Sequence, residues 1–139
     1  MPFVRIETNQ TADVVASAAI VKEVTALVLK VKPEVERRGI AVSLHHNCVL
    51  SFDGDATKAA VVITMTNARM PHEVTLPLTQ GLTAITKKYY GADPLRTYAF
   101  YHELTELHLV GLMGVTFEEL RAAAPAAPAA PVPPAPPEK

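Results

Sequence analysis

The strongest constraint on the fold is a strand–helix–strand pattern that occurs twice along the 139-residue chain. The first half runs from a strand at Phe3 to a second strand at Ile40, 37 positions later, and the second half runs from Val61 to Thr97, 36 positions later. A helix between two strands implies a right-handed parallel crossover. Two halves of equal length therefore predict an α/β (α+β) fold, in which a four-stranded mixed sheet carries both helices on one face.

Apolar residues at helical spacing place the two helices. Thr11 or Asp13 can cap the first helix, which we expect to run to residue 30. The second helix is predicted to follow Thr75, with Pro77 tolerated in its first turn and Gly91 at its end.

Alternating or continuous apolar runs place the strands. They are predicted over residues 3–8, 39–44, 59–66 and 97–101, with a short extra strand over 49–52. The stretch 108–117 is apolar but contains Gly111 and Gly114, which favours short strands that are candidates for pairing with another subunit.

The composition changes near residue 121. Seven of the twelve prolines lie beyond it, mostly among alanines, so we predict one domain over 1–120 and a disordered, solvated polyproline II tail over 121–139. Pro131-x-x-Pro134 leaves open docking to an SH3-like groove, against a passive tail.

Charge and apolar content exclude several classes of protein. Thirteen Lys and Arg against fourteen Asp and Glu give a net charge of −1, which argues against a nucleic-acid partner. No apolar run is long enough for a membrane span, and no signal-peptide pattern opens the chain. We expect a cytoplasmic protein, and secretion without a signal peptide stays open.

A metal site is not expected at the cluster of His45, His46 and Cys48. Adjacent side chains on a strand point to opposite faces, whereas a metal needs three or four ligands on one side. Cys48 is the only cysteine, so no intrachain disulfide can form.

The chain begins Met1-Pro2, directly before the first predicted strand. Methionine is usually trimmed before a small residue such as proline, which leaves a free secondary amine. An α-amino group titrates at about 7.7–8.0, and burial or a nearby cation lowers that pKa. Met-Pro also occurs by chance, but a strand that starts at residue 3 would hold the amine in place. Pro2 is thus a candidate proton acceptor at neutral pH.

Six short features carry a family resemblance by their order and spacing. They are Met1-Pro2 before a strand, Lys32-Pro33 after the first helix, Ile40-Ala41-Val42, Phe52 followed by Gly54, Arg96-x-Tyr98, and Gly114-x-Thr116-Phe117. Together they resemble the macrophage migration inhibitory factor and D-dopachrome tautomerase family, from Met1 to about Phe117. The resemblance implies a homotrimer of β-α-β pseudo-repeats.

The resemblance also implies a reaction, namely cofactor-independent keto–enol tautomerisation of aromatic α-keto acids such as phenylpyruvate. Pro2 matches the family's acid/base, and Lys32 matches a pocket lysine that neutralises the substrate carboxylate. Without the resemblance, Lys32 would be interpreted as a lysine complementing the helix dipole. Tyr98 matches a pocket tyrosine donated by the neighbouring subunit. Asn67 lies where the family uses a backbone N–H.

Several positions depart from the family pattern. Phe100 stands where the mammalian cytokine has an asparagine, so this substrate-binding position loses its hydrogen-bond donor. His102 and Leu112 replace an aromatic pair at the pocket mouth. The mammalian Cys-x-x-Cys pair falls on Ala59 and Val62, so no thiol oxidoreductase activity is expected.

Two other classes of function compete with the isomerase. One is a cytokine-like binding protein with weak or vestigial tautomerase activity, whose partner is a receptor or host protein. The other is a structural trimer with a decayed pocket. Pro2 and Lys32 favour the enzyme, whereas Phe100 and Leu112 favour its rivals.

Overall fold

The computed structural model describes residues 1–106 and 109–123 of the chain. It divides into two compact units, Met1–Thr105 and Glu106–Lys139, each of which is described by itself. The sequence had placed one domain over 1–120, so the division falls before the short strands that were expected to complete it.

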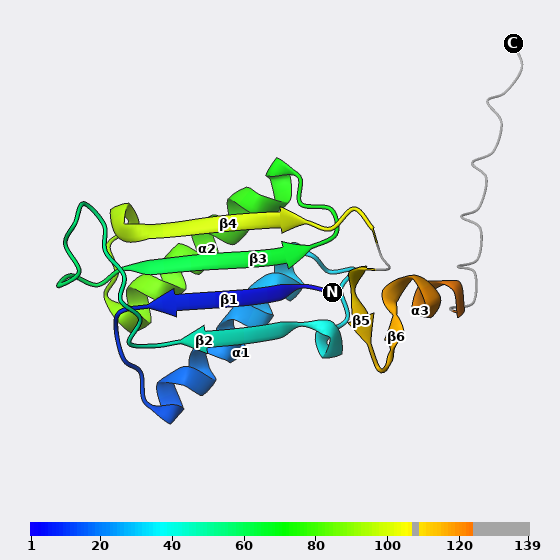
Figure 1. Cartoon of the computed structure of the whole chain (residues 1–139), viewed down its shortest axis with the longest axis horizontal. Helices are drawn as coiled ribbons and strands as arrows, with labels where there is room; N and C mark the ends of the chain where they lie inside the picture. Colours follow the sequence, from blue (N-terminus) through cyan, green and yellow to red (C-terminus); the bar gives the residue numbers. More distant parts are fainter. Residues whose placement is uncertain (107–108, 124–139) are drawn as a thin grey trace, which may run out of the picture. The chain divides into compact units, whose positions relative to one another are not determined.

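The first unit holds the two strand–helix–strand halves (Figure 1). In chain order its elements are β1 (Phe3–Thr8), α1 (Val14–Val31), the 3₁₀ turn η1 (Arg37–Gly39), β2 (Ala41–His45), β3 (Val61–Asn67), α2 (His72–Tyr90), the 3₁₀ turn η2 (Pro94–Arg96) and β4 (Thr97–Glu103).

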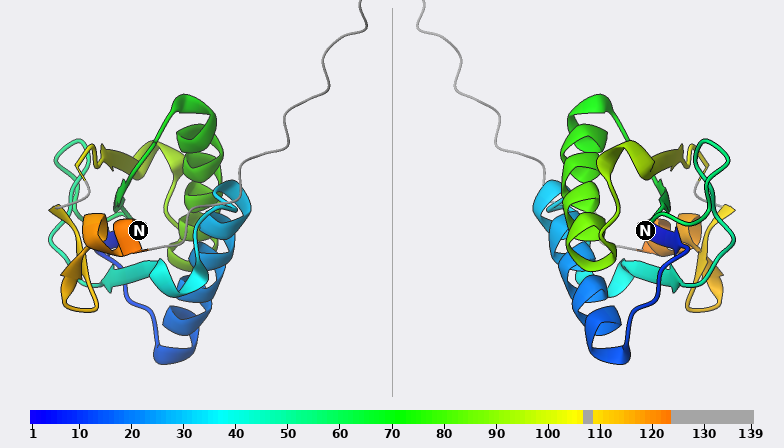
Figure 2. Two further views of the ribbon diagram at one scale, coloured as in Figure 1. Left: turned by 90° about the vertical axis from the view of Figure 1, so that its right-hand side faces the viewer. Right: turned by 90° about the vertical axis from the view of Figure 1, so that its left-hand side faces the viewer.

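The four strands form one mixed sheet in the order β2-β1-β3-β4. Strands β1 and β2 are parallel, as are β3 and β4, and the two halves join through antiparallel pairing of β1 with β3. Both helices lie on one side of the sheet, as Figure 2 shows. The predicted four-stranded mixed sheet with two helices on one face is therefore confirmed.

The core fills the layer between the sheet and the helices. On β1 the side chains of Val4, Ile6 and Thr8 are fully buried, whereas Phe3 and Arg5 are exposed on the other face. Strand β3 also buries every second residue, and the helices contribute complementary apolar stripes. The buried helix residues are Ile20, Val24 and Val28 of α1 and Leu78, Leu82, Ile85, Thr86 and Tyr90 of α2.

The helix ends only partly match the prediction. Asp13 is the N-cap of α1, and its Oδ1 accepts from the Ala16 N–H at 2.7 Å. Helix α2 begins at His72, before the predicted start, so Pro77 lies inside the helix and not in its first turn. There it cannot donate the backbone bond that the i−4 carbonyl would receive. Gly91 closes α2 at φ 68°, as expected.

The predicted extra strand over 49–52 is wrong. Val49 is 98% exposed, and Phe52 forms only an isolated bridge with Asp55. Polar side chains from outside this segment fix it instead, since Asn9 Nδ2 donates to the carbonyl of Leu50 and Arg96 Nη1 donates to that of Phe52. A short apolar run does not reveal such bonds.

The second unit begins with a small hairpin, in which β5 (Gly111–Leu112) pairs with β6 (Val115–Thr116). Short strands were expected here, and their pairing with another subunit stays a prediction. Helix α3 (Phe117–Ala123) then extends three residues into the predicted tail, so residues 121–123 are a correction to it. The rest of the tail, including Pro131-x-x-Pro134, lies outside the described residues. Among the helices of the described part, none is both long and apolar enough to cross a membrane.

Two valines on α1 offer a matched test of the core. Val24 is fully buried and Val15 is 78% exposed. Val24→Ala removes two buried methyl groups and leaves a cavity, so it should lower the free energy of unfolding by about 2–3 kcal/mol. Val15→Ala should change it by less than about 0.5 kcal/mol. Urea unfolding measures both, and equal effects would contradict the placement of α1.

Candidate active site

Three elements that are distant in sequence meet at one end of the first unit. Strand β1 starts there, and helix α1 returns to it because a helix of 18 residues spans the length of the strand. Strand β3 ends there because it runs antiparallel to β1, with Phe3 opposite Thr66. The antiparallel pairing therefore brings together Pro2, Lys32 and Asn67, which the sequence had assigned to one pocket.

Pro2 is buried and held by the sheet. Its carbonyl accepts the Ala41 N–H at 3.0 Å, which extends the parallel ladder of β1 and β2 to the residue before β1. The first residues are thus fixed against the core. In the chain as printed, Met1 precedes Pro2 and the Pro2 nitrogen is an amide.

Asn67 forms the wall opposite the start of the chain. Its side chain is on the buried face of β3, and the residue is 2% exposed. Its Oδ1 accepts from the Met1 amine at 3.3 Å. No acceptor in the described part of the chain bonds to its Nδ2. Asn67 therefore holds a buried donor available to a ligand.

Lys32 supplies the positive charge of the site. It is the C-cap residue of α1, and its side chain is 4% exposed. Its Nζ donates to the carbonyls of Ala68 and Arg69, at 3.3 and 2.8 Å, and pairs with Glu34 Oε1 at 3.1 Å. Its ammonium group thus binds the connection after β3. A lysine that only complemented the helix dipole would not require these contacts.

The environment favours a neutral amine at the start of the chain. Burial is the larger cause that lowers the pKa of the Met1 amine below its ordinary value, and the positive charge of Lys32 lowers it further. An amine there loses its proton more readily than one in water.

Tyr98 and Phe100 lie elsewhere in the same chain. Tyr98 pairs with Val62, four residues before the Thr66 that faces Phe3, so it lies about 13 Å along the sheet from Phe3. Both side chains are on the sheet face away from the helices, 58% and 50% exposed. Their rings contact each other, with centroids 5.7 Å apart. Within one chain the structure does not bring them to Pro2.

Arg96 fixes the surroundings of Tyr98. Its guanidinium donates to the carbonyls of Phe52, Asp55, Lys58 and Ala59, at 2.7–3.2 Å. The ring of Phe52 in turn stacks on Tyr98 with centroids 5.2 Å apart. In the Arg96-x-Tyr98 motif, Arg96 therefore fixes the loop that carries Phe52, and Phe52 packs against Tyr98.

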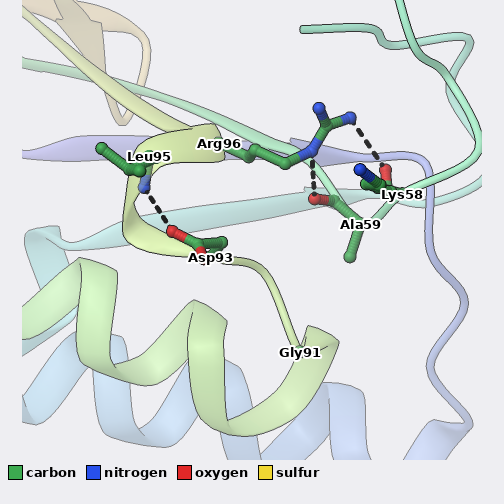
Figure 3. Close-up of a pocket in the computed structure, with 6 residues that line it drawn as sticks. All are labelled: Lys58, Ala59, Gly91, Asp93, Leu95 and Arg96. Carbon is green, nitrogen blue, oxygen red and sulfur yellow. Dashed lines mark hydrogen bonds between the residues drawn. The ribbon is translucent and has the colours of Figure 1, made fainter.

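A hollow of about 520 Å³ lies beside Arg96 and is also lined by Lys58, Ala59, Gly91, Asp93 and Leu95. Figure 3 shows how these side chains lie. It lies where β3 and β4 begin, at the other end of these strands from Asn67. Its polar groups already bond within the chain, for example the Asp93 carboxylate to the Leu95 N–H at 2.8 Å. The hollow contains none of the residues that the sequence assigned to the pocket, so the candidate site is the one at Pro2.

The remaining polar candidates make separate contacts. His45 bonds to Ser43 at 2.7 Å, and His46 bonds to Tyr90 at 2.9 Å. Over residues 1–106 and 109–123 no group of three metal-binding side chains occurs. His102 is exposed on β4, and Leu112 belongs to the second unit. Sequence reasoning did not single out Glu34, although a carboxylate two residues after the pocket lysine was its signal.

Comparison with solved structures identifies the fold. The chain matches MIF2 of Leishmania major with a TM-score of 0.73 and 19% identity, over 84% of this chain and 97% of that one. It matches the macrophage migration inhibitory factor homologue of Prochlorococcus marinus with a TM-score of 0.75 and 15% identity, over 83% and 98%. The protein Pt0534, inactivated by 2-oxo-3-pentynoate, matches with a TM-score of 0.72 and 10% identity, over 85% and 98%.

The sequence alone is less informative, since no family model and no curated protein matches it significantly. The chain nevertheless has the fold of macrophage migration inhibitory factor and its homologues, as the resemblance in the sequence predicted.

The charge of Lys32 should control the pKa of the terminal amine. Lys32→Gln removes the nearby cation, so protonation of the amine becomes easier and its pKa rises. Lys30→Gln, on the exposed side of the last turn of α1, is the matched control and should leave that pKa unchanged. An NMR titration of the first residue measures both variants, and a fall or no change in Lys32→Gln would contradict the electrostatic coupling.

Proposed function

We propose that the chain is a cofactor-independent keto–enol tautomerase that uses the amine of Pro2 as acid and base once Met1 is removed. The observation that carries the proposal is the buried position of Pro2 before β1, next to the Met1 amine, whose pKa is lowered by burial and by the charge of Lys32. A general base works best when its pKa lies near the working pH.

The proposed reaction moves one proton between two positions of the substrate. The neutral Pro2 nitrogen takes the proton from the carbon next to the substrate's carbonyl. The electron pair of the broken C–H bond forms the new carbon–carbon double bond, and the π pair of the carbonyl moves onto its oxygen. The free Nδ2 donor of Asn67 is suited to bond the oxygen on which negative charge develops. Pro2 then returns its proton to that oxygen. The family resemblance had implied only a backbone N–H of Asn67 in contact with the substrate, and had implied Tyr98 of the neighbouring subunit as a further pocket residue.

The charge of the site supports a carboxylate substrate. Lys32 is a buried cation beside the amine, and the ion pair with Glu34 demonstrates that a carboxylate fits against it. Pt0534, which shares the fold, is inactivated by 2-oxo-3-pentynoate, a 2-oxo carboxylic acid by its name. We therefore propose a small α-keto acid as substrate, with phenylpyruvate as the aromatic example that the family resemblance implies.

A homotrimer is the proposed assembly. Phe3, Tyr98 and Phe100 are 43–58% exposed on the face of the sheet that the helices leave open. Large exposed aromatics on one face are suited to contact with another copy. A neighbouring subunit would also explain how Tyr98 reaches a site from which its own chain separates it.

A cytokine-like binding role is the second candidate. Several of the proteins with this fold are macrophage migration inhibitory factors by name. Phe100 and Tyr98 give the open face aromatic contacts for a protein partner such as a receptor or host protein. This role does not need the amine of Pro2, so the two candidates separate experimentally.

Replacing the Pro2 amine, or converting it to an amide, should strongly reduce tautomerase activity. Pro2→Gly keeps a free amine but loses the ring nitrogen, and should lower kcat/KM for phenylpyruvate about 100-fold or more. One alanine inserted between Met1 and Pro2 keeps the proline but makes its nitrogen an amide, with the same expected loss. The absorbance of the enol follows the reaction. Wild-type rates in both variants would refute the role of the Pro2 amine, and mass spectrometry establishes whether Met1 is removed.

Mixing two inactive variants should restore activity if Tyr98 acts across subunits. Pro2→Gly subunits supply Tyr98, and Tyr98→Ala subunits supply Pro2. In a randomly reassembled trimer, about a quarter of the sites then combine both intact residues. Recovery of about that fraction is expected after co-refolding equal amounts. If co-refolded trimers recover no activity, Tyr98 and Pro2 do not act together across a subunit boundary, contrary to the proposal.

A further inference from the structure

The cation of the candidate site already has a full set of partners. The ammonium group of Lys32 carries three protons, and three acceptors lie within hydrogen-bonding distance of Nζ. Two are the carbonyls of Ala68 and Arg69, at 3.3 and 2.8 Å, and the third is Glu34 Oε1 at 3.1 Å. A substrate carboxylate can therefore bind Lys32 fully only by replacing one of them.

The two carbonyls are fixed by the fold. They belong to the connection after β3, in which Arg69 has a positive φ of 54°. The next residue, Met70, donates its N–H to Glu103 of β4 at 2.8 Å. Moving either carbonyl would disturb the junction of β3, β4 and α2, so these two bonds are permanent parts of the site.

Glu34, unlike the two carbonyls, can be replaced by a substrate carboxylate without a change in the backbone. Its side chain is 65% exposed, and it lies on the connection after α1. Arg69 is a second positive charge that acts on the Glu34 carboxylate, although the larger influence comes from Lys32. Exchange of Glu34 for another carboxylate also leaves the charge around Lys32 unchanged.

We propose that Glu34 is a built-in counter-ion of Lys32, which a substrate carboxylate displaces, and that it thereby sets the affinity of the site for anionic substrates. The inference rests on the proposed function, because it concerns the same cation. An ion pair with one exposed partner is weak, so its competition should weaken carboxylate binding about two- to sixfold. A neutral substrate does not compete with Glu34, so its affinity should not depend on Glu34.

The test compares Glu34→Gln with the matched control Glu36→Gln. Glu36 is an exposed carboxylate of the same connection, and it pairs with Arg38 at 2.5 Å, away from Lys32. In Glu34→Gln the KM for phenylpyruvate should fall about two- to sixfold while the KM for its methyl ester stays constant. The Kd of 3-phenylpropanoate, a carboxylate that lacks a keto group, should fall by the same factor in calorimetry. Glu36→Gln should change none of these.

The outcomes separate the inference from the proposed function. An unchanged or raised Kd for 3-phenylpropanoate in Glu34→Gln overturns the counter-ion, and so does an equal fall in KM for acid and ester. If the wild type does not isomerise phenylpyruvate but Glu34→Gln still binds 3-phenylpropanoate more tightly, the tautomerase proposal fails and the counter-ion stands.

Discussion

The antiparallel pairing of β1 with β3 is the constraint on which the candidate site depends. It sets the start of the first half against the end of the corresponding strand in the second half, with Phe3 opposite Thr66. Because α1 runs back along β1, its C-cap Lys32 arrives at the same end. Parallel pairing of the two halves would place Asn67 at the far end of the sheet from Pro2. The chemistry of the site thus follows from strand direction.

Burial and charge act together at that end of the sheet. Burial alone would hold an amine neutral, but it would also exclude an anionic substrate. The Lys32 ammonium group lowers the pKa of the amine further, and as a cation it compensates the charge of a bound anion. Glu34 moderates the same cation from the solvent side. A site of this kind needs no metal to bind and orient a carboxylate.

The repeated pattern was sufficient to predict the four-stranded sheet and its covered face. The assignment of Pro2, Lys32 and Tyr98 to one site came from the family resemblance and stays a prediction. The ends of helices and strands were harder to predict where they depend on hydrogen bonds from distant side chains. The segment 49–52 is apolar enough for a strand, yet Asn9 and Arg96 hold its carbonyls from outside. Glu34 was missed although it lies two residues after Lys32, because its contact with the ammonium group depends on where α1 ends. Such bonds are absent from local periodicity.

The amide of Asn67 carries a consequence for how this protein can change. Its Nδ2 is buried and, within residues 1–106 and 109–123, has no bonding partner, a situation that costs about 1–3 kcal/mol relative to a paired group. Selection for heat resistance alone would exchange this side chain for an apolar one of similar volume. Thermostable descendants obtained without a screen for turnover are therefore expected to lose this wall of the pocket early, while the sheet around it stays intact.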